Sequence, residues 1–300
     1  MFISLVLAAG LTPVMSKSLA AGKRPKVIVG AKTFTEQFIL TELISNRLQQ
    51  GGFDAESKTN MGSTILFNAL TQGTVDCYVD YSGTIWANIM HREDSPGAQE
   101  VLKQMTAFLK QKDGVVCLGA LGFENTYALA VTHKLAQEKN IHSIEDLVPY
   151  APQLTAAGDY EFFARPEWQS LVDTYGLQFK DKRSMDAALM YSAIVRGEVD
   201  VISAYSTDGR IADYNLVVLD DPKAAFPPYD AVILLSPQAA ENQRLVAALK
   251  PLVGAIDNKS MRNANKLVDV DEKSVSTAAD WLNEHIRSGF PNEVSSDDGN

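Results

Sequence analysis

Histidine and cysteine are scarce in this chain of 300 residues, which has four histidines and two cysteines. The histidines are scattered rather than clustered at the short spacing that metal sites need, at His91, His133, His142 and His285. The sequence also has no His-Glu-x-x-His pair, no Gly-x-Ser-x-Gly turn and no glycine-rich phosphate loop. It therefore predicts no metal site, no cofactor and no catalytic residue.

Positive charge is also in short supply. The chain has 27 lysines and arginines against 37 aspartates and glutamates, and its net charge is −10 at pH 7. A surface of this sign repels polyanions. Nucleic acid and anionic membranes are therefore disfavoured as partners.

The chain lacks the apolar run of roughly 20 residues that a membrane-spanning helix needs. The apolar segment 2–15 contains Pro13 and ends at the polar residues 16–18. With the small residues 18–21 as a cleavage site, it predicts a signal peptide over 1–21, although the basic start of such a signal is missing. No cysteine follows the cleavage site, so we expect a soluble, exported, non-lipidated protein in the periplasm. A short buried helix is the alternative for this segment.

Strands and helices alternate through the first part of the chain. The pattern is a βαβαβ unit, with expected elements at 27–30, 33–50, 53–58, 64–72 and 75–80. Thr33 and Glu36 have the spacing of a capping box at the start of the first helix. The order predicts an α/β fold with a parallel sheet and right-handed crossovers.

The length and the 46% hydrophobic content suffice for two cores, so we expect two lobes. Lobe one would comprise 25–124 and a return segment 227–288, and lobe two would comprise 125–226. A strand from Tyr127 would cross into lobe two, and segment 226–235 would cross back. Residues 289–300 are rich in Ser, Asp, Gly and Asn, which is typical of a flexible tail.

One stretch of ten residues occurs twice. Residues 73–82 align without a gap with residues 197–206, and the matched positions include a glycine, an aspartate, a tyrosine and a serine. Each copy places a tyrosine, Tyr81 or Tyr205, where a strand ends. Because ligands of open α/β sheets lie beyond the carboxyl ends of the strands, the two tyrosines are expected to face one cleft.

Four tyrosines stand where a strand ends or the chain changes lobe: Tyr81, Tyr127, Tyr205 and Tyr229. Taken singly, each could be a core residue. Several ring faces around one point suit a cation that cannot donate hydrogen bonds, such as a quaternary ammonium. The set therefore favours a cation-binding aromatic cage.

Four segments in order resemble the substrate-binding proteins of ABC importers for glycine betaine, proline betaine, choline and related osmoprotectants. They read VGAKTFTEQ at 29–37, DYSGT at 80–84, AYSTDG at 204–209 and FPPYD at 226–230. The resemblance covers nearly the whole mature chain. It implies a two-lobed periplasmic binding protein fold of type II, with two crossover strands and a ligand cleft between the lobes. It also implies delivery of the ligand to a transmembrane ABC permease, and we expect a monomer.

The resemblance assigns the tyrosine box to the four tyrosines named above. It assigns binding of the ligand carboxylate to Lys32, Thr84 and Arg165. Asn125 stands where the family often has Asp, and a contact through its backbone carbonyl should survive that change. Two of these residues have simpler readings, Lys32 as a solvated lysine and Arg165 as a surface ion pair with Glu161 or Glu167.

Glycine betaine combines a trimethylammonium, which suits ring faces, with a carboxylate, which suits Arg and Lys donors. It is therefore the expected ligand. Choline, carnitine or an amino acid on the same fold is the alternative, and an enzyme on a related two-lobed fold is a remote one. Cys77 and Cys117 could form a disulfide in an oxidising compartment or remain buried thiols, and the sequence leaves both open.

Overall fold

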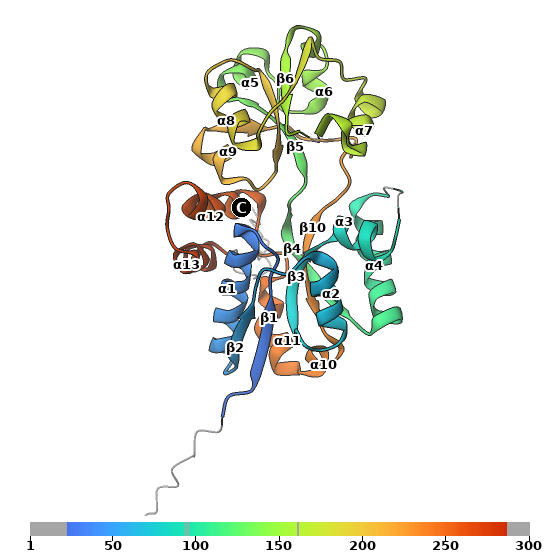
Figure 1. Ribbon diagram of the computed structural model, residues 1–300, viewed down its shortest axis with the longest axis vertical. Coiled ribbons are helices and arrows are strands. Elements are labelled where there is room, and N and C mark those ends of the chain that lie inside the picture. The colour runs from blue at the N-terminus through green and yellow to red at the C-terminus, as the bar shows by residue number, and fades with distance from the viewer. Residues whose placement is uncertain (1–22, 93, 95, 161, 287–300) are drawn as a thin grey trace, which may run out of the picture.

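Two lobes are stacked along the long axis of the molecule and joined by two chain crossings (Figure 1). The structure is a computed structural model that describes residues 23–92, 94, 96–160 and 162–286. The expected signal peptide over 1–21 and the expected tail over 289–300 lie outside the described residues. Within the described part of the chain, no helix has both the length and the apolar character needed to span a membrane.

The sheet of lobe one has five strands in the order β2-β1-β3-β10-β4. Their bounds are β1 (Lys26–Gly30), β2 (Asp54–Lys58), β3 (Cys77–Tyr81), β4 (Val116–Glu124) and β10 (Asp230–Leu235). β1 runs parallel to β2 and β3, whereas β10 is antiparallel to both β3 and β4. The strand that returns from lobe two is therefore inserted into the middle of this sheet.

The sheet of lobe two repeats this arrangement in the order β7-β6-β8-β5-β9. Its strands are β5 (Tyr127–Thr132), β6 (Thr155–Gly158), β7 (Asp181–Ser184), β8 (Val201–Tyr205) and β9 (Leu216–Val218). β5, which enters from lobe one, is antiparallel to both β8 and β9. In the spatial order of each sheet, the fourth strand (β10 or β5) is thus the one that has crossed between the lobes. These two sheets confirm the predicted α/β fold with two lobes and two crossover strands.

The crossings lie between Glu124 and Tyr127 and between Val218 and Asp230, where one sheet ends and the other begins. They support the proposed division into lobe one (25–124 and 227–288) and lobe two (125–226).

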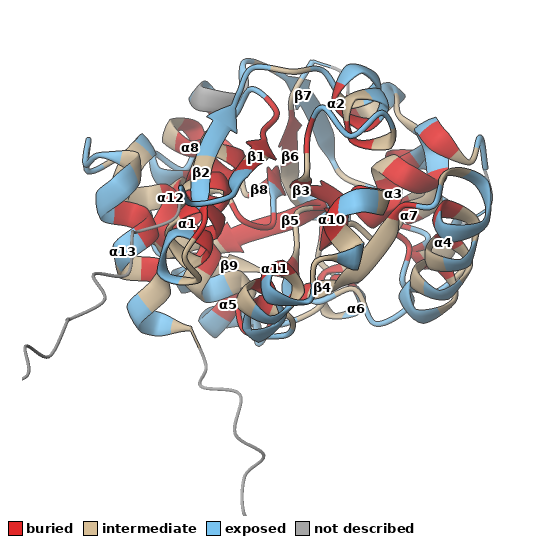
Figure 2. Cartoon of the chain, turned by 90° about the horizontal axis from the view of Figure 1, so that it is seen from below, coloured by how far each residue is buried: buried red, intermediate tan, exposed pale blue. Residues whose placement is uncertain are grey.

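Helices cover both faces of each sheet, and the buried residues gather on the strands and on the helix faces turned toward them (Figure 2). In lobe one they are α1 (Thr35–Gln50), α2 (Ser63–Thr71), α3 (Ser82–Thr84) leading into a π-helical turn (Ile85–Ile89), α4 (Ala98–Asp113), α10 (Pro237–Glu241), α11 (Gln243–Leu249), α12 (Asn258–Asp269) and α13 (Val275–His285). In lobe two they are α5 (His133–Lys139), α6 (Ile144–Leu147), α7 (Pro166–Tyr175), α8 (Ala187–Val195) and α9 (Gly209–Asp213). Short 3₁₀ turns lie at Ala151–Gln153, Phe162–Ala164 and Lys250–Leu252.

The capping box predicted for the first helix is wrong. The N-cap of α1 is Phe34, and it makes no side-chain capping bond. Thr33 therefore lies one residue too early to cap the helix, and Glu36 is free for another role. The helix is instead held by its apolar residues, which recur at helical spacing and are buried, including Ile39, Leu43 and Leu48.

The two cysteines are both free. β10 separates their strands, with Leu235 paired to Cys77 and Leu234 paired to Cys117. Cysteines on strands that are not neighbours lie too far apart for a disulfide. Burial raises the pKa of the Cys77 thiol, so this residue behaves as a small apolar core residue.

The repeated stretch has the same structure in both lobes. Asp76 accepts a hydrogen bond from the backbone N–H of Ile28 at 2.6 Å, and Asp200 accepts one from Thr155 at 2.8 Å. Asp76 thus joins the start of β3 to β1, and Asp200 joins the start of β8 to β6, at the sheet edges away from the cleft. The repeated sequence stretch therefore corresponds to a repeated structure.

The two serines of the repeat each hold one crossing segment. The Ser82 hydroxyl accepts from the N–H of Asp230 at 2.9 Å and donates to the carbonyl of Pro228 at 3.2 Å. The Ser206 hydroxyl accepts from the N–H of Thr126 at 3.1 Å and donates to the carbonyl of Glu124 at 2.7 Å. The third strand of each sheet therefore fixes the crossing segment beside it.

The equivalence of the aspartates can be tested by substitution. Asp76→Ala and Asp200→Ala each leave a backbone N–H without its acceptor, which should lower the free energy of unfolding by about 1–2 kcal/mol. For lobes of this size, thermal unfolding should shift down by roughly 2–4 °C per kcal/mol. Asp280→Ala, at an exposed helix position, is the control and should unfold like the wild type. Loss at only one of the two aspartates would contradict the equivalence.

Candidate ligand-binding cleft

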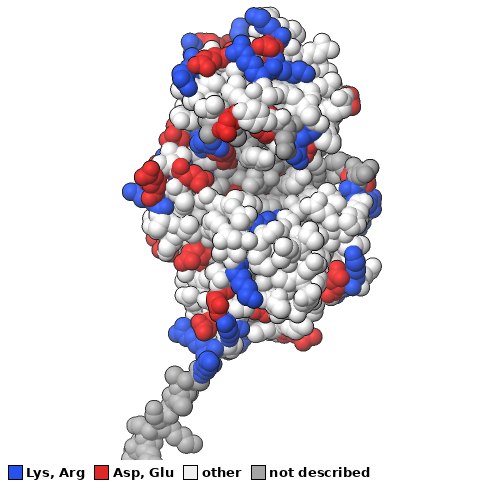
Figure 3. Space-filling view, viewed as in Figure 1, with Lys and Arg blue, Asp and Glu red and all other residues white. Residues whose placement is uncertain are grey.

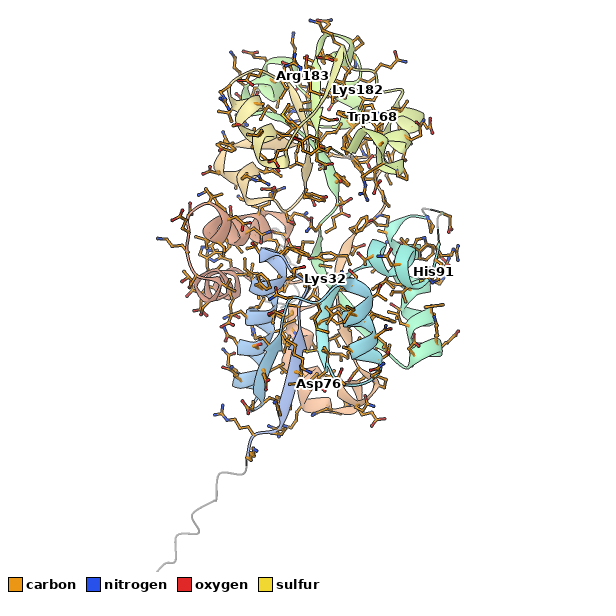
Figure 4. All side chains as sticks on the ribbon, in the orientation of Figure 1. Lys32, Asp76, His91, Trp168, Lys182 and Arg183 are labelled. Carbon is orange, nitrogen blue, oxygen red and sulfur yellow. The ribbon has the colours of Figure 1, made fainter. Side chains whose placement is uncertain are left out.

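A cleft of about 510 Å³ lies between the lobes and is lined by residues of both. The space-filling view shows the hollow at the waist of the molecule (Figure 3). Six of the eight predicted binding residues line it: Lys32, Tyr81, Thr84, Asn125, Tyr205 and Tyr229. Lys32 lies at the end of lobe one that faces lobe two (Figure 4).

Strand geometry brings these side chains together. Tyr81 is the last residue of β3, Tyr205 is the last residue of β8, and Lys32 follows β1 closely. All three strands run parallel to a neighbour in their sheet, and residues at or just after their carboxyl ends line the cleft. The site is thus formed at the sheet edges where α/β proteins bind ligands.

Tyr81 is held firmly in the wall of the cleft. It is 5% exposed, its hydroxyl donates to Glu36 at 2.6 Å, and it accepts from the side-chain amide of Gln37 at 3.2 Å. Phe34 stacks against the ring with centroids 6.1 Å apart. Burial, followed by the neighbouring Glu36 carboxylate, raises the pKa of Tyr81 well above its usual value, so its hydroxyl keeps its proton.

Lys32 is a buried, paired lysine, so its reading as a solvated lysine is wrong. It is 7% exposed, and its ammonium forms an ion pair with Asp80, which is 1% exposed. The Tyr78 hydroxyl donates to the other oxygen of Asp80 at 2.6 Å. The ammonium also lies 5.2 Å from the centre of the Tyr81 ring. Asp80 therefore keeps the Lys32 ammonium beside the Tyr81 ring.

Tyr229 and Asn125 meet at the crossings. The N–H of Asn125 donates to the carbonyl of Tyr229 at 3.1 Å, which joins the outgoing segment to the returning one. A Cβ at Gly83 would lie 2.7 Å from the Tyr229 ring, so only glycine leaves room for this tyrosine. The Asn125 side chain donates to Glu36 at 3.2 Å.

In lobe two, Tyr127 lies behind Tyr205 rather than on the cleft lining. The two ring centroids are 4.8 Å apart, and the Tyr205 hydroxyl donates to that of Tyr127 at 3.2 Å. Tyr205 is 45% exposed, whereas Tyr127 is 7% exposed and borders a larger hollow of about 710 Å³. That hollow contains none of the other predicted residues, so its size does not make it the better candidate.

Arg165 also lies outside the cleft lining. Its guanidinium is 5.4 Å from the centre of the Tyr127 ring and bonds to Glu167 at 3.3 and 3.4 Å. Burial opposes its charge, but the bond to Glu167 and the charge of that residue raise the pKa of Arg165 overall. The ion pair with Glu167, which the sequence left as an alternative, is therefore present.

Glu36 was not predicted as a site residue, yet it is 2% exposed and belongs to the cleft lining. It lies at the start of α1 and accepts hydrogen bonds from Tyr81, Asn125 and Asn265. Burial raises the pKa of Glu36 overall, although the hydrogen bonds that it accepts act in the opposite direction. Its spacing from Thr33 concealed this role, because Thr-x-x-Glu is also the pattern of a helix cap.

Two α/β lobes with a cleft built from the strand ends of both define a two-lobed substrate-binding protein. Residues 25–284 match the family of substrate-binding domains of ABC-type glycine betaine transport systems, and the chain belongs to this family.

Several known proteins are similar along most of their length. The glycine-betaine-binding protein of Pseudomonas aeruginosa is 34% identical over 275 residues, which is 86% of this chain and 87% of the relative. The carnitine transport binding protein OpuCC of Listeria monocytogenes is 28% identical over 267 residues, 87% of each chain. A crystal structure of a glycine betaine/carnitine/choline ABC transporter superposes with a TM-score of 0.82 at 28% identity, covering 86% of this chain and 98% of that one. The fold and the family expected from the sequence are thereby confirmed.

The contribution of the buried Lys32–Asp80 ion pair to stability can be tested by substitution. Asp80→Asn should lower the free energy of unfolding by about 3–5 kcal/mol, because it leaves the Lys32 charge buried without its counter-charge. Lys32→Met in the same protein should recover most of that loss, since the uncompensated charge is then gone. Urea unfolding of the single and double variants measures both effects.

Glu56→Gln is the control for this experiment. It breaks the exposed Lys26–Glu56 pair, whose charges water screens, and should change stability far less than Asp80→Asn. A double variant as unstable as Asp80→Asn would show that Asp80 acts by something other than its charge on Lys32.

Proposed function

We propose that this protein is the solute-binding component of an ABC importer and that it captures a quaternary ammonium osmoprotectant, with glycine betaine as the preferred ligand. The observation that carries the proposal is the cleft between the lobes, which is lined by Tyr81 and Tyr229 of lobe one and by Tyr205 of lobe two. A trimethylammonium cannot donate hydrogen bonds, so ring faces are the surfaces that bind it best. Each ring contributes roughly 0.5–2 kcal/mol once water is excluded.

Tyr127 completes the proposed cage from behind Tyr205. Its hydroxyl also donates to Asp159 at 3.2 Å, so both tyrosines of lobe two are held in place before a ligand arrives. Rigid rings lose little freedom on binding, which favours affinity.

The ligand carboxylate would be bound by Lys32, Thr84 and Arg165. Lys32 keeps donors for a ligand while paired with Asp80, because an ammonium has three N–H groups. Arg165 reaches the carboxylate when the lobes close, with its guanidinium still stacked near Tyr127. The backbone carbonyl of Asn125 is proposed to contact the cation.

Choline, carnitine and other small zwitterions are the alternatives within the same class, because they share the trimethylammonium group or the charge pattern. The similarity to a glycine-betaine-binding protein and to a carnitine transport binding protein supports both ligand types. Membership of a transport family supports a protein without catalysis. An enzyme on a related two-lobed fold is the remote alternative, and turnover of a bound small molecule would reveal it.

The proposed function includes a partner and a location. The loaded protein would deliver its ligand to a transmembrane ABC permease, as a soluble, non-lipidated monomer in the periplasm. The segment over 1–21 would be the export signal.

Calorimetry tests the proposed function directly. Glycine betaine, choline, carnitine and proline betaine should be titrated at two salt concentrations. We expect binding of one ligand per protein, with an affinity that moderate salt changes little, because the cation meets rings in a desolvated cleft rather than exposed charges. No heat with any of the four would refute the ligand class.

Arg165→Ala should separate the ligands. Glycine betaine should bind more weakly by about 1.5–3 kcal/mol, the scale of a hydrogen bond to a charged group, because its carboxylate loses a partner. Choline has no carboxylate and should be affected far less. Calorimetry with both ligands makes the comparison, and equal losses would mean that Arg165 acts through packing or lobe closure.

A further inference from the structure

Glu36 is a buried carboxylate whose hydrogen-bond partners come from several elements that line the cleft. One carboxylate oxygen accepts from the Tyr81 hydroxyl at 2.6 Å and from the Asn125 amide at 3.2 Å, and the other accepts from the Asn265 amide at 3.1 Å. The donors come from β3 of lobe one, the outgoing crossing and α12.

The Glu36 carboxylate has no cationic hydrogen-bond or ion-pair partner within the described residues, and each hydrogen-bond partner donates to it, which favours the ionised form. All its hydrogen-bond donors are neutral, and the ammonium of Lys32, which lies over the Tyr81 ring, is paired with Asp80. Such a group is costly, because burying a charge without an opposite charge is expensive even when hydrogen bonds are made. Glu36 lines the cleft, so a cationic ligand bound there would supply the missing opposite charge.

We propose that Glu36 is a specificity-determining residue, the buried counter-charge that makes the cleft select ligands with a permanent positive charge. This inference rests on the proposed function and deepens it. Glu36 acts through Tyr81, whose ring stands in the cleft wall and whose hydroxyl donates to the carboxylate. A phenol that donates to an anion is polarised, so its ring face becomes more negative and attracts a cation more strongly.

Glu36 also connects ligand recognition to lobe two. The Asn265 amide that donates to Glu36 donates at 2.8 Å to the carbonyl of Thr207, two residues after Tyr205. The guanidinium of Arg262, on the same helix α12, donates to the carbonyl of Ser206 at 3.0 Å. The carboxylate is therefore positioned against both lobes, so its field acts on the space between Tyr81 and Tyr205.

The test compares ligands that differ only in the positive charge. Glycine betaine and 3,3-dimethylbutanoate, its carbon isostere, have the same shape and carboxylate, but only glycine betaine carries the cation. Glu36→Gln keeps the size of the side chain and removes its charge. We expect glycine betaine to bind about tenfold more weakly to this variant, the effect of one nearby charge in a partly screened site. The affinity for 3,3-dimethylbutanoate should not fall.

Glu42→Gln is the matched control, because it removes the same charge from the same helix at a residue outside the cleft lining. It should bind both ligands like the wild type. Should Glu36→Gln fail to fold, Tyr81→Phe makes the same comparison, since it keeps the ring and removes the hydroxyl that reaches Glu36. Tyr81→Phe should weaken the binding of glycine betaine but not of 3,3-dimethylbutanoate, by a smaller factor than Glu36→Gln does.

The outcomes separate the two proposals. A wild type that binds no quaternary ammonium refutes the proposed function and this inference with it. A wild type that binds glycine betaine while Glu36→Gln binds it equally well refutes only the role of Glu36. Equal weakening of glycine betaine and its isostere also overturns that role, because it shows that Glu36 merely supports the structure. Selective weakening of the cationic ligand supports it.

Discussion

The site depends on the register that inserts one crossing strand into the middle of each sheet. β10 pairs with β3 so that Ala231 lies opposite Tyr81, and β5 pairs with β8 so that Tyr127 lies opposite Tyr205. This pairing brings the carboxyl ends of both third strands to the waist of the molecule. A shift of one residue would turn each tyrosine to the other face of its sheet, so the hydrogen bonds of Ser82 and Ser206 to the crossings maintain the geometry of the cleft.

The two buried charged groups beside Tyr81, Lys32 and Glu36, differ in their partners. Lys32 and Asp80 neutralise each other, and Tyr78 satisfies the remaining oxygen of Asp80. Glu36, in contrast, is bound only by neutral donors among the described residues. Under the proposed function, the paired ammonium of Lys32 would suit the carboxylate of a zwitterion such as glycine betaine, and the Glu36 carboxylate would suit its cation.

Much of the fold could be predicted because it follows from local patterns. The alternation of strands and helices predicted the sheets, and the repeated stretch predicted that Tyr81 and Tyr205 would share a cleft. The pairing of Lys32 with Asp80 could not be predicted, since the two residues are 48 positions apart and meet only when β1 and β3 are neighbours. Glu36 was concealed by a cap-like spacing, and the short strand β9 has too few residues for a recognisable pattern. The positions of Tyr127 and Arg165 behind the cleft depend on the packing of lobe two.

The central claim is that each lobe carries half of the binding site, so a ligand stabilises the closed form through contacts that the open form lacks. The exposure of Tyr205, 45% in this structure, is the surface that closure would cover. Small-angle X-ray scattering of the wild type, with and without saturating glycine betaine, measures closure directly. The account predicts a smaller radius of gyration with the ligand and no change with a non-binding sugar of similar size. Tight binding of glycine betaine with an unchanged scattering profile would contradict it.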